Sequence, residues 1–154
     1  VYPGSKLQKV WQKMEEFYDK KEVGALGISN CYDLDVLKYL FNNAKVKPSI
    51  VQNRFYAQSD YDKEIRSFCN ENQITYESFW SLTANPNILS DEVLQNLALK
   101  YERGVAEIFY RFLNHINIVP LNGTTSLKHM IEDLKIGEFK LTREEINSIY
   151  NLLN

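Results

Sequence analysis

Apolar residues recur at three- and four-residue steps in seven segments, a spacing typical of helices that bury one face. The predicted helices cover residues 7–18, 34–44, 61–70, 91–101, 105–113, 127–134 and 142–153. The first has the clearest pattern, and we expect its apolar face to be buried: Leu7, Val10, Trp11, Met14, Phe17 and Tyr18.

Polar residues mark several helix starts. Ser5 is followed by Gln8 and Thr142 by Glu145, the spacing of a capping box, so a helix should begin at each. Ser90 is predicted to cap the helix at 91–101, and residues 80–90 before it are predicted to form a long loop.

Four short apolar runs predict strands at residues 24–28, 49–53, 74–79 and 117–120. They read as runs buried on both faces, as parallel strands are. Strands that alternate with helices indicate an α/β fold with a parallel sheet and crossover helices.

Four such units could form a small doubly wound sheet or half of a (β/α)8 barrel of the TIM type. The chain contains neither of the common glycine-rich nucleotide fingerprints, which leaves the first option without support. Polar residues gather where predicted strands end: Ser29, Asn30, Gln52, Asn53, Asn122 and Thr124. Parallel α/β proteins bind ligands at that end.

Composition narrows the classes of partner. The 154 residues amount to one domain, or to one part of a larger domain, and carry a net charge of -2 from 18 basic and 20 acidic residues. This balance gives no basis for nucleic-acid binding. No apolar run approaches the ~20 residues of a membrane-spanning helix.

The cysteine and histidine counts bear on compartment and metal binding. Two cysteines are too few for a disulfide framework, so we expect a reducing compartment, the cytoplasm or an organelle matrix. With two histidines and no C-x-x-C pair, a structural zinc site is not expected. The chain begins with Val1, which suggests a processed product or a fragment.

Four motifs in order then resemble the aldo-keto reductase family. Residues 27–30 resemble its G-[VI]-S-N-F motif, 46–53 its K-P-x-x-N-Q strand, and 68–74 its F-C-K-E-N-G-I segment. Ile118-Val119-Pro120 with Thr124-Thr125 is similar to its I-P-K-S-x-T turn. The resemblance implies one domain over residues 1–154, the C-terminal half of a (β/α)8 TIM barrel.

The family's catalytic Asp, Tyr, Lys and His belong to the other half, so the resemblance implies no catalytic residue in this chain. It also implies a partner, which is either the missing N-terminal half or another protein chain. Cys69 is predicted to be a small core residue, and no Ser-His-Asp arrangement can be assembled.

For the nicotinamide end of a cofactor, the resemblance implies hydrogen bonds from Ser29, Asn30 and Gln52 to the carboxamide, and stacking on Phe79. Each has a structural alternative. Ser29 and Asn30 could serve merely to cap the next helix or to shape a turn, Gln52 could belong to a buried network, and Phe79 could be a core aromatic.

For the phosphate end, the resemblance places Trp80 and Leu82 along the pyrophosphate and adds Asn122 and Thr124. Leu121 stands where the family has Lys, and His129 near the Arg that grips a 2′-phosphate, with Lys128 beside it and Asp133 near the adenine-contacting position. The implied cofactor is NADP or NAD, bound weakly.

Three functions follow from these features. The chain could be the cofactor-binding half of a nicotinamide-dependent carbonyl oxidoreductase. It could be a pseudoenzyme that serves as a structural or binding subunit of a larger complex, or a nucleotide sensor without turnover.

Overall fold

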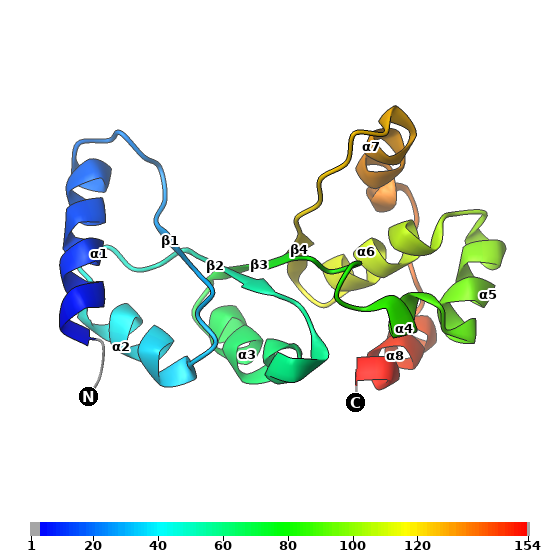
Figure 1. Ribbon diagram of the computed structural model, residues 1–154, viewed down its shortest axis with the longest axis horizontal. Helices are drawn as coiled ribbons and strands as arrows, with labels where there is room; N and C mark the ends of the chain where they lie inside the picture. Colours follow the sequence, from blue (N-terminus) through cyan, green and yellow to red (C-terminus); the bar gives the residue numbers. More distant parts are fainter. Residues whose placement is uncertain (1–3, 154) are drawn as a thin grey trace. The chain divides into compact units, whose positions relative to one another are not determined.

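The computed structural model describes residues 4–153, in which four strands alternate with helices (Figure 1). The strands are β1 (Gly27–Ser29), β2 (Ile50–Arg54), β3 (Thr75–Phe79) and β4 (Ile118–Pro120). The α-helices are α1 (Gly4–Asp19), α2 (Leu34–Asn43), α3 (Lys63–Glu71), α4 (Pro86–Leu89), α5 (Glu92–Tyr101), α6 (Val105–His115), α7 (Leu127–Leu134) and α8 (Arg143–Tyr150). Three 3₁₀ segments are η1 (Ala57–Asp62), η2 (Ile136–Glu138) and η3 (Asn151–Leu153).

The strands form one sheet in the order β1-β2-β3-β4. β1 and β2 are parallel, with Gly27 opposite Ile50 and Ser29 opposite Gln52. Consecutive neighbours joined through helices are the arrangement of a (β/α) barrel, so the predicted α/β class with parallel strands is confirmed.

The chain divides into two compact units. The first combines the residues up to Asn53 with Asp62–Glu77, and the second combines Arg54–Tyr61 with the residues from Ser78 onward. Each unit has its own buried core.

In the first unit, α1 is fixed to the segment before β2 through one residue. Trp11 Nε1 donates to the carbonyl of Val46 at 2.9 Å, and Glu15 Oε1 accepts from the Val46 N–H at 2.9 Å. Trp11 also packs with Leu26 and Leu40 in a buried cluster. Two directional bonds to one residue set the rotation of the helix.

This rotation corrects the prediction that the whole apolar face of α1 is buried. Val10, Phe17 and Tyr18 are exposed, because only the stripe around Trp11, with Leu7 and Met14 partly buried, faces the core. The helix spans Gly4–Asp19, and the Ser5 side chain, on which the predicted capping box depends, lies outside the described residues.

A buried polar network joins β2, β3 and the start of α3. Asn53 bonds both the N–H and the carbonyl of Cys31, at 2.9 and 2.7 Å, and donates to Asp62 Oδ2 at 2.7 Å. The same oxygen accepts from the Tyr76 hydroxyl at 2.8 Å. Every named side chain of this network is less than a tenth exposed, so its polar groups depend on one another for partners.

Helix α3 begins two residues later than predicted. Residues 61–70 were predicted to be helical, but Asp60, Tyr61 and Asp62 have left-handed φ angles of 49°, 51° and 52°. The helix therefore starts at Lys63, after η1. Asp tolerates this conformation better than most residues, because its short polar side chain bonds locally.

The second unit packs its helices around an aromatic core. Phe55, Phe109 and Phe112 are fully buried, with 6.4 Å between the ring centroids of Phe55 and Phe109. Asn85 Nδ2 donates to the carbonyls of Phe55 and Ser81, at 2.7 and 2.8 Å, which fixes the segment after β3. That segment contains α4, so the prediction of an unbroken loop over 80–90 is wrong.

In this unit one predicted helix cap is confirmed and another is corrected. Thr142 and Glu145 form the predicted capping box, with Thr142 N donating to Glu145 Oε2 at 2.7 Å and Glu145 N to Thr142 Oγ1 at 3.3 Å. Helix α5 is capped by Asp91 rather than Ser90, because the Asp91 carboxylate accepts from Val93 N at 2.9 Å.

The strands are less enclosed than predicted. In β2 and β3, fully buried residues alternate with partly exposed ones, and β1 has no fully buried residue. In β2 and β3, one face is therefore covered and the other is partly open. The ladder at β1 also begins at Gly27 rather than Gly24.

Helix α7 forms at the predicted residues, but its apolar side is not buried. Leu127 is 71% and Leu134 87% exposed, and Met130 and Ile131 are exposed as well. In the part of the chain that the structure describes, each helix is too short or too polar to cross a membrane.

Candidate functional site

Polar side chains stand together at the carboxyl ends of β1 and β2, in the first unit. Ser29 and Gln52 are register partners, and directly paired residues present their side chains on the same face of a sheet. Asn30 follows with a left-handed φ of 56°, its N–H donating to the Gln52 carbonyl at 3.0 Å. Asn30 Nδ2 donates to Ser29 Oγ at 3.1 Å, so the structure brings these three predicted residues together.

Glu77, which the motifs did not indicate, belongs to this set. Gln52 Nε2 donates to Glu77 Oε2 at 2.9 Å. Strand alternation could have found this residue, because Glu77 is two positions from Phe79 and therefore on the same face of β3. Ser29, Asn30, Gln52 and Glu77 are called the strand-end cluster below.

In the second unit, a first hollow of about 460 Å³ opens beyond the ends of β3 and β4. Its lining includes the predicted residues Phe79, Trp80, Leu82 and Asn122. The Leu121 N–H donates to the Ser78 carbonyl at 2.7 Å, which ties the segment after β4 to β3.

A second hollow of about 410 Å³ adjoins the first, because Leu82, Tyr110, Asn122 and Gly123 line both. Its wall adds the predicted residues Thr124 and His129. The second unit thus brings together six of the predicted residues: Phe79, Trp80, Leu82, Asn122, Thr124 and His129.

Acidic side chains predominate in the second hollow. Glu107, Glu132 and Asp133 line it beside Lys128 and His129. Burial raises the pKa of Asp133, His129 opposes this shift, and Glu132 and Glu107 add to it. Lys128 Nζ lies 3.6 Å from Glu132 Oε1, so its charge is shared with a carboxylate.

Trp80 has an unusual setting at the first hollow. Its backbone is left-handed, with φ 57°, and its side chain is 56% exposed. The guanidinium carbon of Arg54 lies 4.3 Å from the centroid of the indole ring and 5.2 Å from that of Tyr56. A cation over an indole face fixes the ring while leaving its other face accessible.

Residues 1–154 match the Aldo/keto reductase family over their whole length. The chain belongs to this family. It is 28% identical over 149 residues to the glyoxal reductase of Bacillus subtilis, an alignment that covers 96% of the chain and 53% of that protein. It is also 28% identical over 154 residues to the 9,11-endoperoxide prostaglandin H2 reductase of Trypanosoma cruzi, covering 98% of the chain and 54% of that protein.

The fold is that of solved aldo-keto reductases. The enzyme MGS-M4, from a Medee basin deep-sea metagenome library, superposes with a TM-score of 0.89 at 23% identity, over 100% of this chain and 56% of that one. The aldose reductase of Giardia lamblia gives 0.81 at 20% identity, over 96% and 50%. The chain therefore spans about half the length of the relatives it matches, and has the (β/α)8-barrel type of fold over that half.

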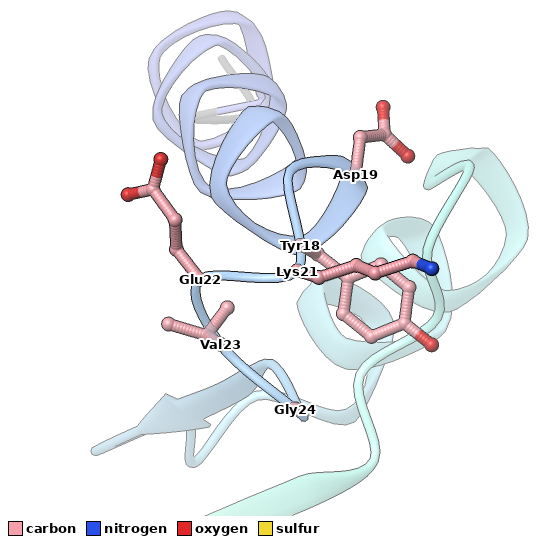
Figure 2. A pocket seen from close by; sticks show the side chains of 6 residues that line it. All are labelled: Tyr18, Asp19, Lys21, Glu22, Val23 and Gly24. Atoms are coloured by element: carbon pink, nitrogen blue, oxygen red, sulfur yellow. The ribbon is translucent and has the colours of Figure 1, made fainter.

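A third hollow, of about 470 Å³, follows α1 (Figure 2). Its lining residues all come from one short part of the chain, between Tyr18 and Gly24. Figure 2 shows the carboxylates of Asp19 and Glu22 pointing away from each other and from Lys21. Since these groups do not converge on a point, we assign no chemistry to this hollow.

Nucleophilic and metal chemistry find no support among residues 4–153. Burial raises the pKa of Cys31 to about 11 and that of Cys69 to about 12, so both thiols stay protonated. Within the described residues, no group of three His, Cys, Asp or Glu side chains could hold a metal ion. His115 lies outside both hollows of the second unit, and its Nε2 accepts from the Leu141 N–H at 3.2 Å.

Proposed function

We propose that this chain is the C-terminal, cofactor-binding half of a nicotinamide-dependent carbonyl oxidoreductase. The observation that carries the proposal is the strand-end cluster, which places a hydroxyl and two amides on neighbouring parallel strands. In such a reaction the nicotinamide supplies or accepts the hydride, and residues of this chain bind and orient it.

The strand-end cluster fits a carboxamide. A carboxamide offers one carbonyl acceptor and an NH₂ donor, and hydroxyl and amide side chains supply both complements. Ser29 and Asn30 are exposed, so they are accessible to a ligand. We assign Ser29, Asn30 and Gln52 to the nicotinamide end.

The two hollows of the second unit fit parts of a dinucleotide. Phe79 offers a ring face for stacking in the first hollow, which Trp80 also lines, and Leu82 lines both hollows. Asn122 and Thr124 add polar groups, and His129 lies beyond them on α7. We assign Phe79 to stacking with the nicotinamide ring, and Trp80, Leu82, Asn122, Thr124 and His129 to the phosphates and the adenosine.

The charge of the second hollow favours NAD over NADP. A 2′-phosphate is a dianion that prefers Arg or Lys, for charge and for bidentate hydrogen bonding. Glu107 is paired with Arg103 Nη1 at 3.3 Å, which leaves Glu132 and Asp133 facing Lys128, and that lysine is already near Glu132. A ribose hydroxyl can donate a hydrogen bond to a carboxylate, whereas a phosphate is repelled by it.

Calorimetry on the purified chain tests this preference. We expect weak binding, with the affinities for NADH and NADPH within about threefold, a difference of less than 1 kcal/mol. Ser29→Ala and Gln52→Ala should weaken both ligands, since each loses a hydrogen bond of about 0.5–1.5 kcal/mol. Ser67→Ala, at an exposed hydroxyl on α3, is the matched control.

Much tighter binding of NADPH than of NADH would contradict the charge argument. Unchanged affinity in both Ser29→Ala and Gln52→Ala would remove these residues from the site.

The second candidate function is a non-catalytic structural or binding subunit derived from an aldo-keto reductase. Leu121 and the acidic wall of the second hollow favour it, because both weaken a phosphate site. We assign no catalytic residue to this chain in either case. Titration with NADH and NADPH separates the two functions, since a pure scaffold binds neither.

We also propose that the chain works with a partner, either a complementary N-terminal half or another protein chain. β1 and β4 stand at the two ends of the strand order, where backbone groups are open to pairing. Leu127, Met130, Ile131 and Leu134 form an exposed apolar stripe along α7. Covering such surface contributes ~25 cal/mol per Å².

The purified chain alone is accordingly expected to associate and to bind an apolar dye. The double variant Leu127→Lys/Leu134→Lys should reduce both effects, because it places charge on the two most exposed residues of the stripe. Asn42→Lys/Asn147→Lys adds the same charge at exposed polar positions and should change neither. A monodisperse monomer that binds no dye and unfolds cooperatively would contradict the proposal.

A further inference from the structure

The bond between Gln52 and Glu77 decides which way the Gln52 amide faces. A glutamine amide has a donor end and an acceptor end, and rotation by 180° exchanges them. A carboxylate can only accept. Since Nε2 donates to Glu77 Oε2 at 2.9 Å, the opposite rotamer would place two acceptor oxygens against each other.

We infer that Glu77 is a positioning residue, which holds Gln52 so that its Oε1 is presented to the ligand as a hydrogen-bond acceptor. This inference rests on the proposed binding of a nicotinamide at the strand-end cluster, and adds a residue to it. Glu77 acts through Gln52, and no contact between Glu77 and the ligand is required.

The other members of the cluster supply the opposite polarity. Asn30 Oδ1 already accepts from the Tyr32 hydroxyl at 3.3 Å, which leaves the Nδ2 end of Asn30 facing Ser29. Ser29 and Asn30 therefore offer O–H and N–H donors, while Gln52 offers an acceptor. A carboxamide matches this pattern in one orientation only: its carbonyl toward Ser29 and Asn30, and its NH₂ toward Gln52.

The inference specifies the ligand chemistry that the cluster recognises. The 3-acetylpyridine analogue of NAD⁺ keeps the carbonyl but replaces the NH₂ by a methyl group, so it cannot donate to Gln52. The wild-type chain should therefore bind NAD⁺ about five- to tenfold more tightly than the analogue, the worth of one hydrogen bond.

The decisive variant is Glu77→Gln, which keeps the size of the side chain. A glutamine at 77 can accept or donate, so the Gln52 amide can turn and present Nε2 to the ligand. The 3-acetyl group can then turn as well, so that its carbonyl accepts from Gln52 and its methyl group no longer faces a hydrogen-bond acceptor there. We expect the ratio of the two affinities, measured by calorimetry, to fall to about one- to twofold. Glu64→Gln removes one negative charge from an exposed position of α3 and should leave the ratio unchanged.

Each outcome bears on a defined claim. A collapse of the ratio in Glu77→Gln alone supports the positioning role. If both ligands weaken equally and the ratio is kept, Glu77 is merely structural and the inference is overturned, while the proposed function stands. If the wild-type chain binds neither dinucleotide, the proposed function and this inference are both overturned.

Discussion

The purified 154-residue chain is expected to show no carbonyl reductase activity. The reason is chemical, because proton donation by a positioned acid contributes about 10²–10⁴ to such rates, and we assign no such acid to these residues. The assay follows the oxidation of NADH and of NADPH in the presence of a small aldehyde. It uses purified chain whose intact mass has been verified.

The glyoxal reductase of Bacillus subtilis, of which this chain matches 53%, is the positive control for that assay. Robust, stoichiometric cofactor oxidation by the verified chain would contradict the prediction. The proton donor would then have to be sought among the side chains described above, with the tyrosines first.

Asp62→Ala is expected to destabilise the protein by about 3–5 kcal/mol. The substitution removes an acceptor shared by Asn53 and Tyr76 and leaves the buried Tyr76 hydroxyl without its partner, at about 1–3 kcal/mol for each group affected. It also places alanine at a φ of 52°, which adds roughly 1 kcal/mol. Urea unfolding followed by tryptophan fluorescence and circular dichroism measures the change.

Two further variants separate these contributions. Tyr76→Phe removes the hydroxyl while Asp62 keeps Asn53, so it should cost less than Asp62→Ala. Glu64→Gln, at an exposed carboxylate of the same helix, should change stability by less than about 0.5 kcal/mol. Equal stability of Asp62→Ala and wild type would mean that the network does not contribute to folding.

Local signals in the sequence were sufficient for the class of fold. The alternation of strand and helix patterns predicted the parallel sheet, because the two periods depend only on how backbone geometry orders side chains. The Thr142–Glu145 capping box was predictable for the same reason: both bonds join residues three apart. The four motifs identified the family, to which the chain belongs over its whole length.

The grouping of the site residues was predicted only in part from the sequence. Ser29, Asn30 and Gln52 follow or lie in predicted strands, and they do meet at the ends of β1 and β2. Glu77 escaped notice because the bond that gives it meaning joins residues 25 positions apart. The acidic wall of the second hollow likewise combines Glu107 of α6 with Glu132 and Asp133 of α7.

Only the tertiary structure decided which apolar faces are covered. Apolar residues recur at helical spacing in both α1 and α7, yet Val10, Phe17, Leu127 and Leu134 are exposed. Periodicity shows that a face is apolar, whereas burial requires a neighbour, and neighbours are supplied by distant segments. The left-handed turn at residues 60–62 was hidden for the same reason, since its bonds to Asn53 and Tyr76 come from two strands. The sequence thus determined the elements and the family of this protein, and tertiary contacts determined its open surfaces and the polarity of its candidate site.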